Sequence, residues 1–391
     1  IKSDNIFVAF AFSPLSMAFQ QHLVNKFSPL LISVFSPLRN CANFAATTQK
    51  AAHSPLPFSL KTMDEFDEDA AMAQRPMPKW KKAGLRIERN CAENQIFLSI
   101  VQEIVDKFGW DNSAHDYDMW KKAFGPNFSM FFVLDQNRVP MGCISMALYP
   151  QVAHWSMFYV KDPYHGHQLG RALARRALEF AGDRPVFGYA VPEMWHKYEE
   201  EYAFHHYLDW RLWSFGAKCA DVRPERLDHD SSVELKDWRE ASFDKLLLFD
   251  RQQTVGIDRS AYLREALRLP QSAAKVAVCR ETGDVVGLCQ ARHLLGDRLG
   301  ISLFYANSES IASALLRAVL LQFAGPDPSA KFDSFIYKTP STNTESIRLF
   351  RQLVQNGPVE RRLFYPQFSR YSLPFPGNRI FSIGDEHVSL I

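Results

Sequence analysis

One order of strands and helices occurs twice in the sequence. The interval from Val133 to Gly142 equals the interval from Val278 to Gly287, and each spans two apolar runs joined by a polar turn, the pattern of a β-hairpin. A strand, a helix, a second strand and a helix-like segment then follow in both places. Agreement in both order and spacing is typical of an internal repeat. The matched segments are residues 156–160 with 302–306, 172–175 with 314–317, and 187–192 with 335–340.

The repeated order predicts an α/β fold of the α+β mixed-sheet kind. Each copy is expected to be a twisted mixed β-sheet flanked by helices, because a hairpin is followed by strand–helix units. The chain has 391 residues, 47% of them hydrophobic, which is enough for two cores. We expect the first copy at residues 83–220 and the second at 233–391, with a polar linker near 219–233 where the apolar pattern stops.

Residues 1–82 precede the first expected domain, and residues 1–62 show no helical or strand period. The tetrapeptide Phe-Ser-Pro-Leu recurs within residues 1–62, and proline breaks each apolar run there. We predict a disordered extension, or residues that lie upstream of a true start at Met63. Two alternatives stay open: the acid-poor, serine-rich start resembles an organelle transit peptide, and residues 6–12 resemble a short secretory apolar core.

Charge and cysteine usage argue against several classes of partner. The net charge of +2 gives no strong field for nucleic acid or a membrane surface, and no run reaches the ~18 apolar residues of a membrane span. The six cysteines are scattered without a Cys-x-x-Cys pair, which favours buried free thiols in a reducing compartment. We therefore expect a cytoplasmic protein that binds neither nucleic acid nor membrane. Nothing in the sequence indicates its oligomeric state.

The connection between the strand at 155–160 and the helix beginning near Leu169 is the most informative part of the first copy. A polar turn at 161–168 joins them, and Gly166 and Gly170 lie where the turn becomes the helix. Glycine lets a ligand approach the backbone, and the free N–H groups of a first helical turn suit a phosphate or pyrophosphate. The alternative is an ordinary strand–turn–helix connection without a ligand.

This arrangement resembles the GNAT superfamily, the acyl-CoA-dependent N-acyltransferases, over residues 85–391. The family signature, Arg/Gln-x-x-Gly-x-Gly/Ala, falls on His165, Gln168 and Gly170, and the first two of these depart from it. Three further segments are similar to a small tandem group of the family whose second domain is a variant. They are residues 109–120, 194–198 and 256–264.

The resemblance implies acetyl-CoA as co-substrate and an amine, a small molecule or a peptide, as acceptor. Direct attack of the amine requires that it lose a proton, that the oxyanion be stabilised and that the thiolate be protonated. In the family, the pantetheine arm pairs with the strand before the turn, and the pyrophosphate lies over the turn. The residues that the resemblance assigns to the cofactor are Phe158, Tyr159, Val160, His165, Gly166, His167, Gln168, Leu169, Gly170 and Arg171.

Three residues are candidates for the proton transfers. The family often carries a thiolate-protonating tyrosine on its last helix, where Tyr198 and Tyr202 lie one turn apart. The repeat places Tyr202 opposite Phe350 of the second copy, so we prefer Tyr202. Packing against the sheet is the alternative for either tyrosine. His154, in the strand before the turn, is the candidate general base, with a pKa near neutrality; the alternative is an ordinary histidine on the strand surface.

No metal site is predicted. His165 and His167 are one residue apart and His205 and His206 are adjacent, but neither pair has a third ligand at a recognisable spacing. We therefore expect a protein whose chemistry rests on backbone groups and proton-transferring side chains.

The second copy departs from the first at the same turn. Its segment between strand and helix is shorter, has no glycine and carries Glu309. Ser308 or Ser310 is expected to cap the following helix. Phe350, at the place of Tyr202, has no proton to give. We predict that this copy is a scaffold or handles CoA in another way. For the whole chain, the alternative to an enzyme is a non-catalytic acyl-CoA-binding or protein-interaction protein.

Overall fold

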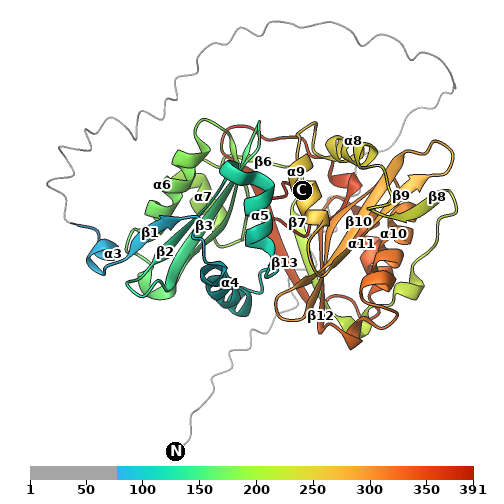
Figure 1. Cartoon of the computed structure of the whole chain (residues 1–391), viewed down its shortest axis with the longest axis horizontal. Helices are drawn as coiled ribbons and strands as arrows, with labels where there is room; N and C mark the ends of the chain where they lie inside the picture. The colour runs from blue at the N-terminus through green and yellow to red at the C-terminus, as the bar shows by residue number, and fades with distance from the viewer. Residues whose placement is uncertain (1–76) are drawn as a thin grey trace, which may run out of the picture. The chain divides into compact units, whose positions relative to one another are not determined.

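The first copy folds as a mixed sheet with helices on both faces. In the computed structural model, which describes residues 77–391, its elements follow the predicted order (Figure 1). The α/β, mixed-sheet fold class is thereby confirmed. The elements of the first copy are β1 (Arg86–Arg89), α4 (Asn94–Phe108), α5 (Asp116–Phe124), β2 (Phe128–Leu134), β3 (Pro140–Leu148), β4 (Ala153–Val160), α6 (Leu169–Ala181), β5 (Val186–Ala190), α7 (Trp195–Tyr202), β6 (His206–Tyr207) and β7 (Leu212–Lys218).

The second copy repeats this order and adds one short strand at its end. Its hairpin, strand, helix, strand and helix lie where the repeat predicts them, and a long and a short strand follow. The elements of the second copy are β8 (Val233–Asp237), α8 (Phe243–Gln253), α9 (Ser260–Leu267), β9 (Ser272–Cys279), β10 (Val285–Leu294), β11 (Arg298–Ala306), α10 (Glu309–Phe323), β12 (Ser334–Pro340), α11 (Thr344–Leu353), β13 (Glu360–Phe368) and β14 (Ile380–Ser382).

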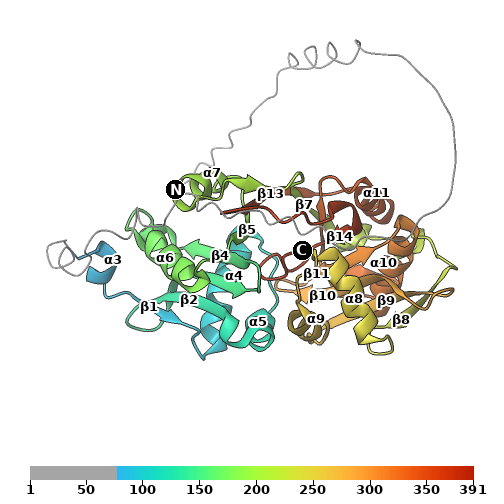
Figure 2. The same ribbon diagram turned by 90° about the horizontal axis from the view of Figure 1, so that it is seen from above.

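The two copies exchange one strand each. β13 of the second copy pairs with β5 of the first, and β7 of the first copy pairs with β12 of the second, so that all strands join in one 14-stranded sheet (Figure 2). β7 and β13 also pair with each other. They occupy the same place in the repeat, because the interval from Phe187 to Leu212 equals that from Phe335 to Glu360. Each copy therefore completes the sheet of the other.

This exchange bears on the predicted division of the chain. All described residues, 77–391, belong to one compact unit. The boundaries 83–220 and 233–391 describe the repeat and stay a prediction as domain limits, since the sheet pairing crosses them. Between β7 and β8 the chain makes two short 3-10 turns, Cys219–Asp221 and Pro224–Arg226.

One short helix lies within the segment that was expected to be disordered. In α3 (Lys79–Lys82), the Trp80 side chain is only 8% exposed and belongs to a core cluster with Leu85 and Phe131. Burial of this large apolar side chain explains why the order begins before residue 83. Residues 1–76, with the predicted extension and the start at Met63, lie outside the described residues.

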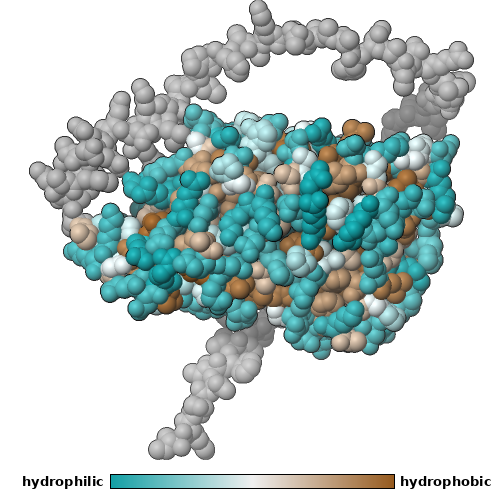
Figure 3. Space-filling model, in the orientation of Figure 1, coloured by the Kyte–Doolittle hydropathy of each residue, from teal (hydrophilic) through white to brown (hydrophobic). Residues whose placement is uncertain are grey.

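Buried ion pairs connect the two copies. Arg292 of β10 binds Asp116 of α5 with Nη1 and Oδ1 2.9 Å apart, and both side chains are almost fully buried. Asp111, just before α5, is bound by Arg298 at 3.0 Å and by Lys338 at 2.6 Å. Removing one partner of such a pair leaves a buried charge without compensation, which is strongly destabilising. The face shown in Figure 3 is mainly hydrophilic, with apolar side chains in separate groups.

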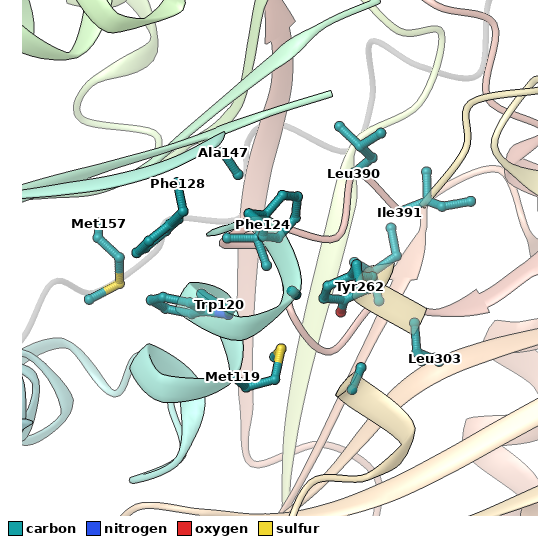
Figure 4. Close-up of a cluster of buried hydrophobic side chains, with 14 of the residues drawn as sticks. Met119, Trp120, Phe124, Phe128, Ala147, Met157, Tyr262, Leu303, Leu390 and Ile391 are labelled. Atoms are coloured by element: carbon teal, nitrogen blue, oxygen red, sulfur yellow. The ribbon is translucent and has the colours of Figure 1, made fainter. Parts of the chain in front are cut away.

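The residues that follow β14, which we call the tail (residues 383–391), run through the interior. Every residue from Asp385 to Ile391 is buried. Figure 4 shows Leu390 and Ile391 near Phe124 of α5 and Tyr262 of α9, and all four belong to one core cluster. The tail is therefore packed between elements of both copies.

Candidate functional site

β4 and β5 are paired over only part of their length. Their parallel register consists of Ala153 with Val186 and His154 with Phe187, and contains no further pair toward the carboxyl ends of the two strands. Beyond His154 the strands diverge, and we call this the β4–β5 splay. The splay leaves the inner edge of residues 156–160 without a neighbouring strand, so an extended ligand can pair there.

A β-bulge lies at the start of the splay. Met157 has a φ of 52°, and the register between β3 and β4 shifts at this point. The bulge breaks the two-residue period of side chains: Trp155 and Phe158 both face α6 and α7, whereas Met157 and Tyr159 face α4 and α5. Such a bulge takes backbone groups out of the regular ladder and makes them available to a ligand.

The turn before α6 has the shape expected of an anion site. Gly166 and Gln168 have φ values of 73° and 63°, and a Cβ atom at Gly166 would meet nothing within 4 Å. α6 begins at Leu169, and the N–H groups of its first turn point out of the helix. A Cβ atom at Gly170 would lie 3.4 Å from the Phe158 ring, so helix and strand approach closely at this position.

The polar side chains around this turn are tied to the protein. His165 contacts the main-chain oxygen of Val160 through Nε2 at 2.7 Å. Arg171 donates to Glu201 of α7 at 3.2 Å, and its hydrogen bond and charge lower the pKa of that carboxyl. His167 lies near the Tyr164 ring at 6.4 Å. Within residues 77–391, no three histidine, cysteine, aspartate or glutamate side chains are grouped so as to hold a metal ion.

Tyr198 and Tyr202 lie on the same side of the splay. Their rings pack against Trp155 at centroid distances of 5.7 and 5.3 Å, and Tyr198 also stacks on Phe158 at 6.2 Å. Burial raises the pKa of both phenols, that of Tyr202 to about 12. Both hydroxyls therefore keep their protons at neutral pH, which a leaving-group acid requires.

The pKa near neutrality and the alternative place on the strand surface, both expected for His154, were wrong. Its side chain is fully buried. Burial lowers its pKa to about 3, so the expected value near neutrality does not hold, nor does a place on the strand surface. The ring packs against Phe187 at 5.0 Å. His154 is buried because β4 lies inside the sheet and because the face of the sheet that carries the His154 side chain is covered.

The tail is what covers this face, and the sequence did not reveal it. His387 Nδ1 lies 2.8 Å from Ser156 Oγ on β4, and the Tyr189 hydroxyl on β5 donates to the main-chain oxygen of Leu390 at 2.8 Å. The tail thus bridges the two diverging strands on the side of α4 and α5. His387 is only 4% exposed, and burial lowers its pKa to about 3, so its imidazole is neutral.

Next to this face, Glu103 of α4 is surrounded by donors. The Tyr159 hydroxyl donates to it at 2.8 Å, and Lys107 and Lys161 pair with it at 3.0 and 2.9 Å. Burial opposes ionisation of Glu103, but these hydrogen bonds outweigh that effect and lower its pKa to about 2. The carboxylate is therefore charged at every physiological pH.

Comparison with known proteins agrees with this geometry. Residues 97–208 match the family model described as the acetyltransferase (GNAT) family. A candidate acetyltransferase from Pyrococcus horikoshii superposes with a TM-score of 0.57 at 13% identity, covering 78% of this chain and 96% of that one. A tandem GNAT protein from the clavulanic acid biosynthesis pathway gives 0.51 at 16% identity, covering 74% and 100%. No protein with a curated description matches the chain.

Residues 97–208 thus match a GNAT domain by sequence, and the described residues have the fold of a tandem GNAT protein. This fold supports acyl transfer in general, and enzymes of the family use amine acceptors. In the part of the chain that the structure describes, no helix combines the length and apolarity needed to cross a bilayer.

Proposed function

We propose that the first copy binds acetyl-CoA in the β4–β5 splay and transfers its acetyl group to an amine by direct attack. The observation that carries this proposal is the combination of an unpaired strand edge at 156–160, a bulge at Met157 and the free N-terminus of α6, all in one strand–turn–helix unit. The strand edge suits the amide groups of a pantetheine arm, and the helix N-terminus suits its pyrophosphate.

The residues of the chain fit this co-substrate in distinct ways. Acetyl-CoA supplies an acyl group that is already activated as a thioester. Backbone N–H groups beside the bulge at Met157 are placed to donate to an oxyanion, which needs no side chain. Tyr198 or Tyr202 gives its proton to the departing thiolate, and glycine at position 170 lets α6 approach the Phe158 ring closely. Within this proposal His154 has no proton-transfer role, because it is buried and neutral.

The acceptor is a small-molecule or peptide amine, and the proposed location is the cytoplasm. The cysteines that the structure describes are free thiols, and all but Cys279 are buried, which suits a reducing compartment. Neither the free thiols nor the proposed location selects among amines, so the acceptor has to be found by experiment.

Calorimetry of the full chain with acetyl-CoA tests the first half of the proposal, and CoA release against a panel of amines tests the second. We expect saturable acetyl-CoA binding and amine-dependent release of CoA. Absence of binding would overturn the whole proposal. Binding without turnover on any amine would support the alternative, a non-catalytic acyl-CoA-binding or protein-interaction protein. One observation favours that alternative: the tail covers the α4–α5 side of the splay, where it bridges β4 and β5.

A further inference from the structure

The second copy has a splay of its own. β11 and β12 pair in parallel as far as Gly300 with Ile336, after which their register ends. Gly300 takes the place of His154 in the repeat, since the intervals from these residues to Ser302 and Ser156 are equal. The two pairs of strands therefore diverge at equivalent positions.

Strand β14 lies inside this second splay. It pairs antiparallel with β11, with Ser382 opposite Phe304 and Ile380 opposite Tyr305. It also reaches β12 on its other side: the Ile383 N–H donates to the Lys338 carbonyl at 2.9 Å. All three residues of β14 are fully buried. The strand thus fills the space between β11 and β12.

Side chains of the second copy bind the main chain of β14. Ser346 of α11 donates its hydroxyl proton to the Phe381 carbonyl at 2.7 Å, and Asn343 donates to the Ile380 carbonyl at 2.9 Å. Immediately after β14, a Cβ atom at Gly384 would lie 2.3 Å from the Ser302 Cα atom, so only glycine fits. The fit is close along the whole strand.

The residues that meet β14 correspond to those that the proposed function assigns to the acyl-CoA arm. Phe304 and Tyr305 take the places of Phe158 and Tyr159. Ser346 takes the place of Tyr198, because the interval from Pro192 to Tyr198 equals that from Pro340 to Ser346. An extended chain with alternating donors and acceptors is the feature shared by a β-strand and a pantetheine arm.

We propose that the splay of the second copy is a binding site for the chain's own strand β14, which occupies it as an extended ligand occupies the splay of the first copy. The comparison with the first copy rests on the proposed function, whereas the occupation by β14 does not. The second copy is then closed to acyl-CoA, and one chain binds one acyl-CoA.

By binding β14, the second copy also positions residues that contact the first copy. β14 anchors the tail, and Glu386 of the tail pairs with Lys338 of β12 at 2.5 Å. From this anchor the tail reaches β4 of the first copy, where His387 meets Ser156. The second copy thereby anchors the segment that covers the α4–α5 side of the first splay.

Hydrogen exchange of the full wild-type chain, followed by mass spectrometry with and without acetyl-CoA, tests the proposal. Peptides covering residues 380–391 are expected to exchange at least about 1,000-fold more slowly than an unstructured chain, in both states. Peptides covering 156–170 are expected to slow only when acetyl-CoA is added. Fast exchange at 380–391, or acetyl-CoA protection of 304–312, would overturn the proposal. Slow exchange at 380–391 with no response at 156–170 supports the occupation by β14 and counts against the proposed function instead.

A pair of tail variants tests the anchoring. Gly384→Ala should displace the tail and accelerate exchange of the peptides after residue 384. Ser389→Ala is the matched control, because the buried Ser389 hydroxyl has no hydrogen-bond partner among residues 77–391, and its loss should leave exchange unchanged. Exchange in Gly384→Ala that is as slow as in the wild-type chain would contradict the anchoring. If Gly384→Ala does not fold, the wild-type measurement decides.

Discussion

Each copy has a splay at the same place in the fold, but the two splays differ in what can occupy them. In the first copy the strand edge at 156–160 faces no strand, and the adjoining turn has glycine at two positions. In the second copy the corresponding edge pairs with β14. The comparison teaches that the two strands diverge in both copies and that β14 fills the divergence in the second copy. Whether a copy can take an extended ligand depends on what else fills the splay.

The turns before α6 and α10 also differ, and this difference too favours a ligand in the first copy. α10 is capped by Ser308, whose hydroxyl accepts from the Ile311 N–H at 3.3 Å, as the sequence predicted. Glu309 in its first turn pairs with Arg348 of α11. A carboxylate there favours the helix dipole but repels a phosphate. The second turn is therefore built for helix stability, and the first keeps its N–H groups for another partner.

The largest expected effect follows from the strand exchange. A chain ending after Lys218 lacks β13, so β5 loses one of its two neighbours and β7 loses both of its partners. Two exposed edges and an open core should prevent folding. We expect residues 77–218 to show no cooperative thermal transition by circular dichroism, whereas residues 77–391 show one. A cooperative, monomeric 77–218 fragment would show that the exchange is dispensable.

The sequence predicted the elements better than it predicted their partners. The repeat located β2 to β5 and β9 to β12, because hairpins and amphipathic helices leave local periods. It contained no information about the exchange of β7 and β13, since equivalent strands look alike whichever sheet they join. β14 has three residues, too few to show a period.

The candidate site shows the same limit. The turn at 161–168 was found because glycines and a helical period mark it. The tail was missed because Asp385, Glu386 and His387 form a polar run that normally lies in solvent. Their burial depends on partners far away in the chain, Trp120 and Lys338 among them. His154 was misjudged for the same reason, since the tail is what buries it.

The next effect tests which splay accepts acetyl-CoA. Gly170→Glu would place a carboxylate at the first turn of α6, beside Phe158. We expect loss of acetyl-CoA binding by at least about 100-fold in calorimetry, because charge and bulk both oppose a phosphate there. Gly170→Ala, whose added methyl would meet Phe158 at an ordinary 3.4 Å, should lose much less. Full affinity in Gly170→Glu would remove the cofactor from this turn.

A smaller effect separates the two tyrosines. The repeat alignment favoured Tyr202, opposite Phe350, but the residue of α11 that contacts β14 is Ser346, the counterpart of Tyr198. We therefore propose Tyr198 as the leaving-group acid. Tyr198→Phe should lower kcat by about 100-fold with little change in acetyl-CoA affinity, the range usual for general acid catalysis. Tyr202→Phe is the matched control and should be nearly silent. The opposite pattern would restore Tyr202.

The smallest effects compare two equivalent tyrosines, Tyr159 and Tyr305. The Tyr305 hydroxyl is fully buried, accepts from Arg259 at 2.8 Å and donates to the Ile391 main-chain oxygen at 3.0 Å. Tyr305→Phe should therefore reduce the free energy of unfolding by about 1–3 kcal/mol, since it leaves buried polar groups unpaired. Tyr159→Phe removes a hydrogen bond to the partly exposed Glu103, so its cost should be nearer the net value of about 0.5–1.5 kcal/mol. Urea unfolding of both variants measures the difference.

The loss of stability in Tyr159→Phe should also depend on pH, and the pKa of Glu103 determines whether the loss grows or shrinks as the pH falls. Burial opposes the charged form, but hydrogen bonds from Lys161, Tyr159 and Lys107 lower the pKa from 4.5 to about 2. A carboxyl whose pKa is lower in the folded than in the unfolded state stabilises the fold. This contribution is complete above the pKa of the unfolded state, and it is lost as the pH falls through the pKa of the folded state. The melting temperatures of wild type and Tyr159→Phe should therefore differ by a constant amount above about pH 5 and converge below it. Tyr305→Phe, whose hydroxyl contacts a guanidinium and a main-chain oxygen, is the control and should keep its deficit over this range. A Tyr159→Phe deficit that persists at low pH would mean that its origin is packing, not the hydrogen bond to Glu103.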